Sequence, residues 1–196
     1  MTHTPTLCEM SEFPNLSSSS AGQNIILVGF MGCGKSTVGR EIGMQLNYSL
    51  IDTDALIEKS VGKSIAEVFA DEGEEYFRGL ETELLGQIHS TNCTHQIIST
   101  GGGLPVRPEN RVWLKKIGYV VWLKAGVDIV MKRTAKSTHR PLLRTENVKQ
   151  KVEKMLTARD PIYAEVADLS INTDDLEISE TVHGIIESAN YHFSNY

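Results

Sequence analysis

A glycine-rich turn between an apolar run and a helical pattern constrains the fold of this chain more than any other sequence feature. The run NIILVGF at residues 24–30 overlaps the segment GFMGCGKS at residues 29–36, which fits the pattern G-x-x-x-x-G-K-[ST]. Apolar residues then recur at helical spacing, at Val38, Ile42 and Leu46. A strand, a phosphate loop and a helix in this order predict an α/β domain that binds a nucleoside triphosphate.

The chemistry of the turn follows from its residue types. Glycines let successive backbone N–H groups face a phosphate, and the start of the helix adds the positive end of its dipole. We expect Lys35 to reach the β- and γ-phosphates and the Ser36 hydroxyl to bind Mg²⁺. The alternatives are a glycine-rich turn that only happens to precede Lys-Ser, and a nucleophilic role for Cys33, which we expect instead to bind phosphate through its backbone N–H. The predicted ATP-binding residues of the loop are Gly32, Cys33, Gly34, Lys35, Ser36 and Thr37.

Four further apolar runs and the helical patterns between them extend this domain over residues 24–196. The runs predict strands at residues 48–51, 96–100, 119–123 and 167–171, with the run at 24–30 as the central strand. Helical patterns occupy residues 35–46, 64–69, 71–89, 107–116, 127–135, 147–166 and 179–189. This alternation predicts a three-layer αβα domain with a five-stranded parallel sheet. Such sheets bind ligands at the carboxyl ends of their strands.

Composition and net charge limit the classes of partner and the cellular location that we expect for this protein. Residues 1–23 include a serine-rich stretch and no pattern of a secretory or transit signal, so we expect a disordered tail and a cytoplasmic protein. The net charge of -6 disfavours a nucleic-acid partner, and no apolar run approaches the roughly 18–20 residues of a membrane span. The three cysteines, Cys8, Cys33 and Cys93, form no CxxC pair, so neither a disulfide framework nor a zinc site is indicated. Since no long apolar surface helix stands out, we expect a monomer.

Two aspartates follow the second predicted strand, at the edge where ligands bind. If the chain stays extended, Asp52 and Asp54 share one side of it, so one carboxylate could lie near Mg²⁺ while the other takes a proton from an acceptor alcohol. A helix that begins at Asp54 would separate them, and either residue could instead be the N-cap of that helix. The third strand ends in Ser99-Thr100 and lacks the aspartate of a Walker B motif, so Asp52 is the candidate for the carboxylate near the metal.

Arginines and a triple glycine occur in later segments. Gly101-Gly102-Gly103 follows the third strand, where glycine allows close approach of the backbone to a ligand. Residues 135–144 form a basic loop that could close over phosphates and bring Arg140 to the transferring group, or could be an ordinary solvent loop. Arg78 lies in a helical stretch, and Arg159 precedes Pro161, which we expect to end or kink its helix. Taken alone, each of these two arginines is typical of a surface residue.

Several motifs in a fixed order resemble those of one family. After the phosphate loop come DTD at residues 52–54, FRxxE at 77–81, GGG at 101–103, RPLL at 140–143 and RxPxY at 159–163. This set resembles the shikimate kinase family, part of the nucleoside-monophosphate-kinase-like group of P-loop kinases, over residues 24–183. The phosphate loop alone is shared by many nucleotide-binding proteins, whereas the full set in this order is specific.

The resemblance implies transfer of the γ-phosphoryl group of ATP to the 3-hydroxyl of shikimate, a step of aromatic amino-acid biosynthesis in the chorismate pathway, with Mg²⁺ as cofactor. It implies a catalytic set of Lys35, Asp54 and Arg140, in which Asp54 binds the substrate hydroxyls and Arg140 acts from the lid at the phosphates. The remaining implied contacts are Arg78 and Arg159 with the shikimate carboxylate, Gly101, Gly102 and Gly103 with the substrate, Asp52 with Mg²⁺ through water, and Arg133 with adenine. The segment NTDDLE at residues 172–177 departs from the family, because it is acidic and lacks the proline that lines the adenine.

Two other functions are compatible with part of this pattern. A gluconate kinase would share the phosphate loop and the lid, but it would not need two arginines for a carboxylate together with a triple glycine. A nucleotide-dependent binding protein would change conformation without phosphorylating a metabolite, and its function would survive Asp54→Asn. ADP release that depends on shikimate distinguishes our interpretation from both.

Overall fold

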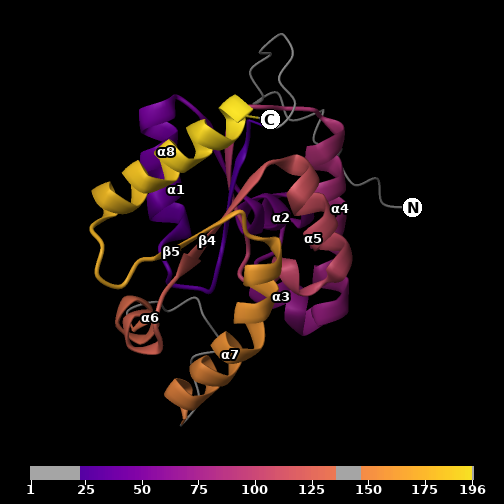
Figure 1. Cartoon of the computed structure of the whole chain (residues 1–196). Coiled ribbons are helices and arrows are strands. Elements are labelled where there is room, and N and C mark those ends of the chain that lie inside the picture. Colours follow the sequence, from indigo (N-terminus) through magenta and orange to yellow (C-terminus); the bar gives the residue numbers. More distant parts are fainter. Residues whose placement is uncertain (1–22, 136–146, 196) are drawn as a thin grey trace.

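The computed structural model describes residues 23–135 and 147–195, and in this part of the chain five strands form one parallel sheet (Figure 1). The strands are β1 (Ile25–Val28), β2 (Ser49–Asp52), β3 (Gln96–Ser99), β4 (Tyr119–Lys124) and β5 (Leu169–Asn172), in the order β2-β3-β1-β4-β5. The register pairs Ile26 of β1 with Ile98 on one side and with Val120 on the other. The predicted five-stranded parallel sheet, with the first strand at its centre, is therefore confirmed.

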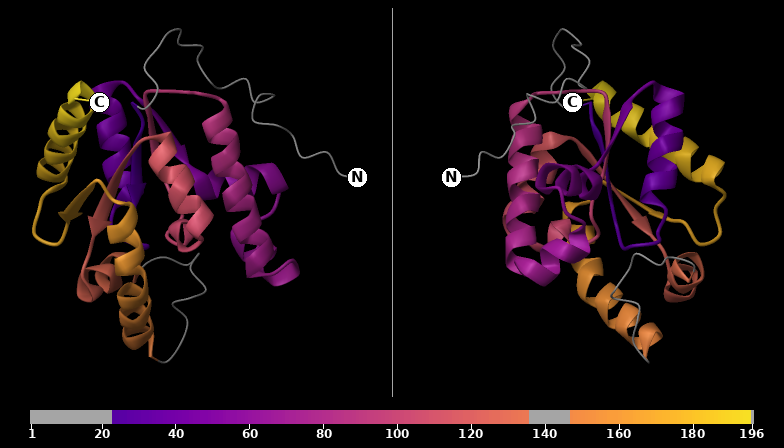
Figure 2. Two further views of the ribbon diagram at one scale, coloured as in Figure 1. Left: turned by 45° about the vertical axis from the view of Figure 1, so that its right-hand side comes forward. Right: turned by 180° about the vertical axis from the view of Figure 1, so that it is seen from behind.

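Helices cover both faces of this sheet and make the predicted three-layer αβα arrangement. They are α1 (Lys35–Leu46), α2 (Thr53–Val61), α3 (Ile65–Asp71), α4 (Glu74–Ser90), α5 (Pro108–Ile117), α6 (Val127–Thr134), α7 (Val148–Val166) and α8 (Ile178–Asn195), with a short 3₁₀ turn, η2 (Leu104–Val106). α1 and α8 lie on one face, whereas α4 and α5 lie on the other, as both views in Figure 2 show.

Alternation along the central strand divides the core into two apolar clusters. Ile25 and Leu27 belong to the cluster formed with α1 and α8, whereas Ile26 and Val28 belong to the cluster formed with α4 and α5. All four side chains are fully buried. A strand that is buried on both faces has a continuous apolar sequence, which explains why residues 24–30 indicated the central strand.

Two helical features answer questions that the sequence left open. α2, which the sequence offered only as an alternative interpretation of Asp52 and Asp54, begins directly after Asp52 because that carboxylate caps it, and it ends at Gly62, with a φ of 68°. α7 continues through Pro161 to Val166, as the predicted range 147–166 implies, so of the two effects expected of this proline the end of the helix does not occur. Proline removes one backbone donor, but the buried side chains of Tyr163 and Val166 hold the last turns of α7 in the core.

The carboxyl ends of β1, β2 and β3 meet at one edge, because these neighbouring strands run parallel. The phosphate loop follows β1, Asp52 ends β2, and Gly101 follows β3. Arg140 with the rest of the RPLL segment, and the predicted tail apart from Gln23, lie outside the described residues. Across residues 23–135 and 147–195, no helix has the length and apolar character needed to span a membrane.

Candidate active site

The phosphate loop surrounds the N-terminus of α1. Gly32 and Gly34 have φ angles of 82° and 106°, which residues with side chains rarely adopt. Gly34 is the N-cap of α1 and has no side chain to pair with the first N–H groups of the helix, so these donors can bind an anion. The Lys35 side chain also lies against this loop, because its Nζ donates to Gly29 O at 2.8 Å and to Phe30 O at 3.0 Å.

Cys33 connects this loop to the segment after β5. Its carbonyl accepts hydrogen bonds from Arg133 Nη1 at 3.3 Å and from Thr173 Oγ1 at 3.2 Å. Arg133 also donates to Thr173 O at 2.9 Å. The Cys33 side chain is fully buried, as expected of a small filling residue, but its N–H, which we predicted to bind phosphate, donates to Phe30 O at 3.3 Å.

Asp52 is the N-cap of α2 and also contacts Ser36, the other residue predicted to bind the metal. Its Oδ1 accepts from the N–H groups of Asp54 at 3.1 Å and Ala55 at 3.3 Å, which makes it the N-cap of α2. Its Oδ2 accepts from the Ser36 hydroxyl at 3.4 Å. Mg²⁺ in proteins takes oxygen ligands, usually one or two from side chains and the others from phosphates and water. The adjacent hydroxyl and carboxylate therefore fit this metal.

Asp54 lies in the first turn of α2 and lines the same cleft as Ser36 and Asp52. The pKa of its carboxyl is raised to about 6, first by burial and then by Asp52, although Lys35 lowers it. Its Oδ1 is buried and has no hydrogen-bond partner among the described residues. The side chain as a whole is only partly buried and lines the cleft, so the carboxylate can accept there from a bound hydroxyl while Oδ1 lies against Gly101.

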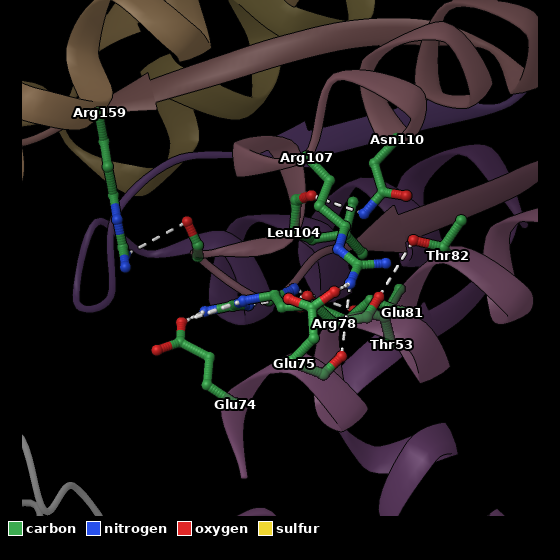
Figure 3. A network of polar contacts seen from close by, with 12 residues as sticks. Thr53, Glu74, Glu75, Arg78, Glu81, Thr82, Leu104, Arg107, Asn110 and Arg159 are labelled. Carbon is green, nitrogen blue, oxygen red and sulfur yellow. Dashed lines mark hydrogen bonds and ion pairs between the residues drawn. The ribbon is translucent and has the colours of Figure 1, made fainter. Parts of the chain in front are cut away.

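Arg78 is held by two carboxylates of its own helix, α4 (Figure 3). Its Nη1 pairs with Glu81 at 2.7 Å and its Nη2 with Glu74 at 2.9 Å. Burial raises the pKa of the fully buried Glu81 to about 7, although Arg78 opposes the shift. Burial would lower the pKa of Arg78, but Glu81 and Glu74 outweigh it and raise that pKa. The Nε, Nη1 and Nη2 atoms each use one N–H in these contacts, which leaves two of the five donors of an arginine for a ligand.

Arg159 reaches the same cleft from α7. Its Nη1 donates to Gly102 O at 3.4 Å (Figure 3), and its guanidinium lies 5.5 Å from the centre of the Phe30 ring. Tyr163, one turn later on α7, donates from its hydroxyl to the same carbonyl at 2.5 Å. α7 thereby contacts both the triple glycine and the phosphate loop.

Two of the three consecutive glycines leave space for side chains of the protein itself. A Cβ at Gly101 would overlap Asp54 Oδ1, and a Cβ at Gly103 would lie 2.7 Å from Cζ of Arg78. Neither Gly101 nor Gly103 has a φ in the left-handed region. Glycine is therefore required at these positions by the lack of space for a side chain and not by the backbone conformation. We predicted the triple glycine from close approach to a ligand, and the structure adds that any larger residue would displace Asp54 or Arg78.

These groups line one cleft of about 1200 Å³. One part of it holds the phosphate loop, and another part holds Asp54 with Arg78 and Arg159. The predicted site residues that it brings together are Gly32, Cys33, Gly34, Lys35, Ser36, Thr37, Asp52, Asp54, Arg78, Gly101, Gly102, Gly103, Arg133 and Arg159.

Further residues in or next to the cleft had no role in the sequence analysis. The Thr53 hydroxyl accepts from the N–H of Gly101 at 2.9 Å and so ties β3 to α2. Ile65 and Phe69 of α3 form an apolar wall, and Glu81 pairs with Arg78. The i,i+3 spacing of Arg78 and Glu81 could have indicated their pairing. No local signal could have indicated the bond between Thr53 and Gly101, because these residues meet only in the folded sheet.

Comparison with known proteins adds independent evidence about this cleft. A family model described as "Shikimate kinase" matches residues 31–190. The chain is 43% identical over 164 residues to the shikimate kinase of Thioalkalivibrio sulfidiphilus, which covers 83% of this chain and 84% of that protein. It is 39% identical over 166 residues to the shikimate kinase of Caldanaerobacter subterraneus, which covers 85% of this chain and 95% of that protein.

Solved structures extend the similarity to three dimensions. Shikimate kinase from Acinetobacter baumannii, in complex with shikimate, superposes with a TM-score of 0.81 at 37% identity and covers 87% of this chain and 94% of that one. A gluconokinase from Sinorhizobium meliloti superposes with a TM-score of 0.59 at 16% identity and covers 89% of this chain and 95% of that one. At that identity, the second similarity concerns the fold alone.

Proposed function

Because the chain belongs to the shikimate kinase family, we propose that its cleft transfers the γ-phosphoryl group of ATP to the 3-hydroxyl of shikimate. The bond from the γ-phosphorus to the bridging oxygen breaks and a bond to the 3-hydroxyl oxygen forms, so the products are ADP, shikimate 3-phosphate and a proton. The observation that carries this proposal is that a phosphate loop, a buried carboxylate and two arginines line a single cleft. Phosphoryl transfer requires mainly positioning and charge neutralisation, which these groups supply.

The phosphate loop is the proposed site of the β- and γ-phosphates. The first N–H groups of α1 and the Lys35 ammonium would neutralise the phosphate oxygens. Ser36 and Asp52 would hold Mg²⁺, which, when bound, neutralises charge on the phosphates. Support for this assignment comes from the adjacent oxygen donors of these two side chains.

Asp54 is the proposed proton acceptor. The part of its carboxylate that lines the cleft can accept the hydrogen bond of the attacking hydroxyl, which orients that group toward the phosphate loop. With a pKa of about 6, the carboxyl is mostly ionised at neutral pH and is still basic enough to take a proton as the new bond forms. The proton released by the reaction therefore passes first to this carboxylate.

Arg78 and Arg159 are the proposed ligands of the shikimate carboxylate. A protein with a net charge of -6 repels an anionic substrate at long range, so local cations have to bind it. Arginine binds carboxylates through two parallel N–H donors. The two donors of Arg78 that its glutamates leave, and those of Arg159 on the other side of Gly102, supply such contacts.

Adenine is proposed to lie beside Arg133, at the opposite end of the cleft. Leu176 and Ile178 line the cleft there and remain exposed by 43% and 51%, so they offer apolar surface where the family has a proline. Asp174 accepts from the N–H of Gly126 at 3.0 and 3.1 Å, at the start of α6. The acidic segment therefore supports the helix that carries Arg133.

A coupled assay of ADP release with ATP and Mg²⁺ tests the function. We expect turnover that depends on shikimate, no comparable turnover with gluconate, and a phosphorylated product at the 3-position by NMR. Activity with gluconate and none with shikimate would overturn the proposal, as would ADP release that is independent of any acceptor.

A further inference from the structure

Tyr163 lies on the core side of α7 and contacts Gly102, which lines the cleft. Its side chain is 1% exposed, and its ring packs against Trp122 with 5.8 Å between ring centres. Its hydroxyl donates to the Gly102 carbonyl at 2.5 Å. Burial raises the pKa of this phenol, so it stays protonated, and a carbonyl can only accept. The direction of the bond is therefore fixed.

The Gly102 carbonyl lies between α7 and the phosphate loop. It also accepts the longer bond from Arg159 Nη1, at 3.4 Å. On the other side, a Cβ at Gly102 would meet Gly29 O and Met31 N, each at 3.4 Å. Gly102 therefore packs against the phosphate loop on one side and accepts two hydrogen bonds from α7 on the other. The shorter of these two hydrogen bonds comes from Tyr163.

The same peptide also limits the position of Arg78. A peptide group is planar, so fixing the Gly102 carbonyl fixes the orientation of the N–H end at Gly103. The guanidinium of Arg78 lies against Gly103, because a Cβ there would be 2.7 Å from its Cζ atom. The Gly102–Gly103 peptide group therefore accepts a hydrogen bond from Arg159 at its carbonyl oxygen and lies against Arg78 at its N–H end.

We propose that Tyr163 is a positioning residue whose hydroxyl fixes the Gly102–Gly103 peptide and thereby the spacing between Arg159 and Arg78. The inference rests on the proposed function, since this spacing matters only if both arginines hold one carboxylate. Without the hydroxyl, the Gly102 carbonyl keeps only the bond from Arg159. A partly buried carbonyl that has lost its shorter hydrogen bond draws that guanidinium toward itself and away from the substrate.

Tyr163→Phe tests this role, because it keeps the buried ring and removes only the hydroxyl. We expect the KM for shikimate to rise about five- to tenfold, on the scale of one lost hydrogen bond, with kcat and the KM for ATP changed by less than about twofold. The ratio of kcat/KM for shikimate to that for its methyl ester should fall, because the ester lacks the charge that the two arginines bind. Tyr119→Phe is the matched control, since that hydroxyl, 2.7 Å from Ser188 Oγ, lies outside the cleft and its loss should change neither constant.

The outcomes separate the possible explanations. An unchanged KM for shikimate, or an equal rise for shikimate, its methyl ester and ATP, would overturn the positioning role, because a general loss of packing acts on all ligands. Thermal unfolding of both tyrosine variants reports the purely structural effect separately from these constants. A wild-type protein that does not phosphorylate shikimate would overturn the proposed function itself, whereas an active wild type with an unaffected Tyr163→Phe variant overturns only this inference.

Discussion

At the scale of single residues, the chemistry depends most directly on Asp54. Asp54→Asn keeps the size of the side chain but removes the base, so we expect kcat to fall by about 10²–10⁴ while the KM for shikimate changes little. Coupled ADP release measures both constants. Asp71→Asn is the control, because that carboxylate is exposed and pairs with Lys63 outside the cleft. Full activity of Asp54→Asn would favour a nucleotide-dependent binding protein that performs no chemistry.

The protonation of Asp54 predicts how the activity depends on pH. Its pKa of about 6 means that the base is ionised above this pH and protonated below it. We therefore expect kcat/KM for shikimate to be constant at about pH 7–8 and to fall roughly tenfold per pH unit below the pKa. A rate profile between about pH 5 and 8 measures this, with the fold checked by circular dichroism at each pH. A profile that stays flat to the acid end would contradict the assignment.

The sequence identified the residue types of the cleft better than their environments. Asp54 and Arg78 followed from the order of motifs, whereas the raised pKa of Asp54 and the pairing of Arg78 with the buried Glu81 depend on what surrounds them after folding. From the sequence, Asp52 was a candidate both for the N-cap of a helix and for the carboxylate near the metal. The structure shows two oxygens of one carboxylate in two contacts, which a one-dimensional pattern cannot express.

At the scale of elements, the segment after β3 limits the position of Arg78 on α4. Gly103→Ala would place a methyl group against the guanidinium, so we expect the KM for shikimate to rise about tenfold or more with little effect on the KM for ATP. Gly86→Ala is the matched control: it lies in α4 with open space where the methyl group would go, and there alanine should raise the free energy of unfolding by about 0.5–1 kcal/mol. Equal kinetic constants for Gly103→Ala and wild type would show that Arg78 can shift without loss.

Elements were predictable where burial or helical periodicity repeats along the sequence. The range of α1 matches the prediction, and the central strand was evident because its apolar residues are buried on both faces. α2 remained one of two alternatives, because its start is a capping contact of Asp52 and not a change in periodicity. The helical pattern at residues 147–166 predicted α7 past Pro161, but the effect of this proline stayed open because the packing of Tyr163 in the core lies outside the local sequence.

At the scale of the whole molecule, the site exists because distant segments end at one edge of the sheet. Asn24 contributes to this alignment at the opposite edge, where its Nδ2 donates to Cys93 O at 2.9 Å and to Ile117 O at 3.1 Å. Its Oδ1 accepts from the N–H of Gln96 at 3.0 Å, so one buried amide joins the segments that precede β1, β3 and β4. The order of motifs predicted which segments form the site, but only the folded sheet supplies such bonds between them.

The buried carboxyl groups also predict how the stability of the whole fold varies with pH. The pKa of Glu81 is raised to about 7 and that of Asp54 to about 6, so between their unfolded values near pH 4 and these values the folded chain binds more protons than the unfolded chain. Their contribution to the free energy of unfolding is therefore complete below about pH 4 and is lost as the pH rises to about 7, by on the order of a few kcal/mol.

Glu81→Gln isolates one of these groups, because glutamine cannot lose a proton. We expect the free energy of unfolding of this variant, relative to wild type, to increase steadily as the pH rises from about 4.5 to 7 and then to level off. Urea unfolding followed by tryptophan fluorescence at a series of pH values measures this difference. Glu153→Gln, at an exposed position on α7, is the control for the loss of one carboxylate from the surface. A constant difference for Glu81→Gln would mean that Arg78 keeps Glu81 ionised throughout, and the cleft would then carry a permanent ion pair at its base.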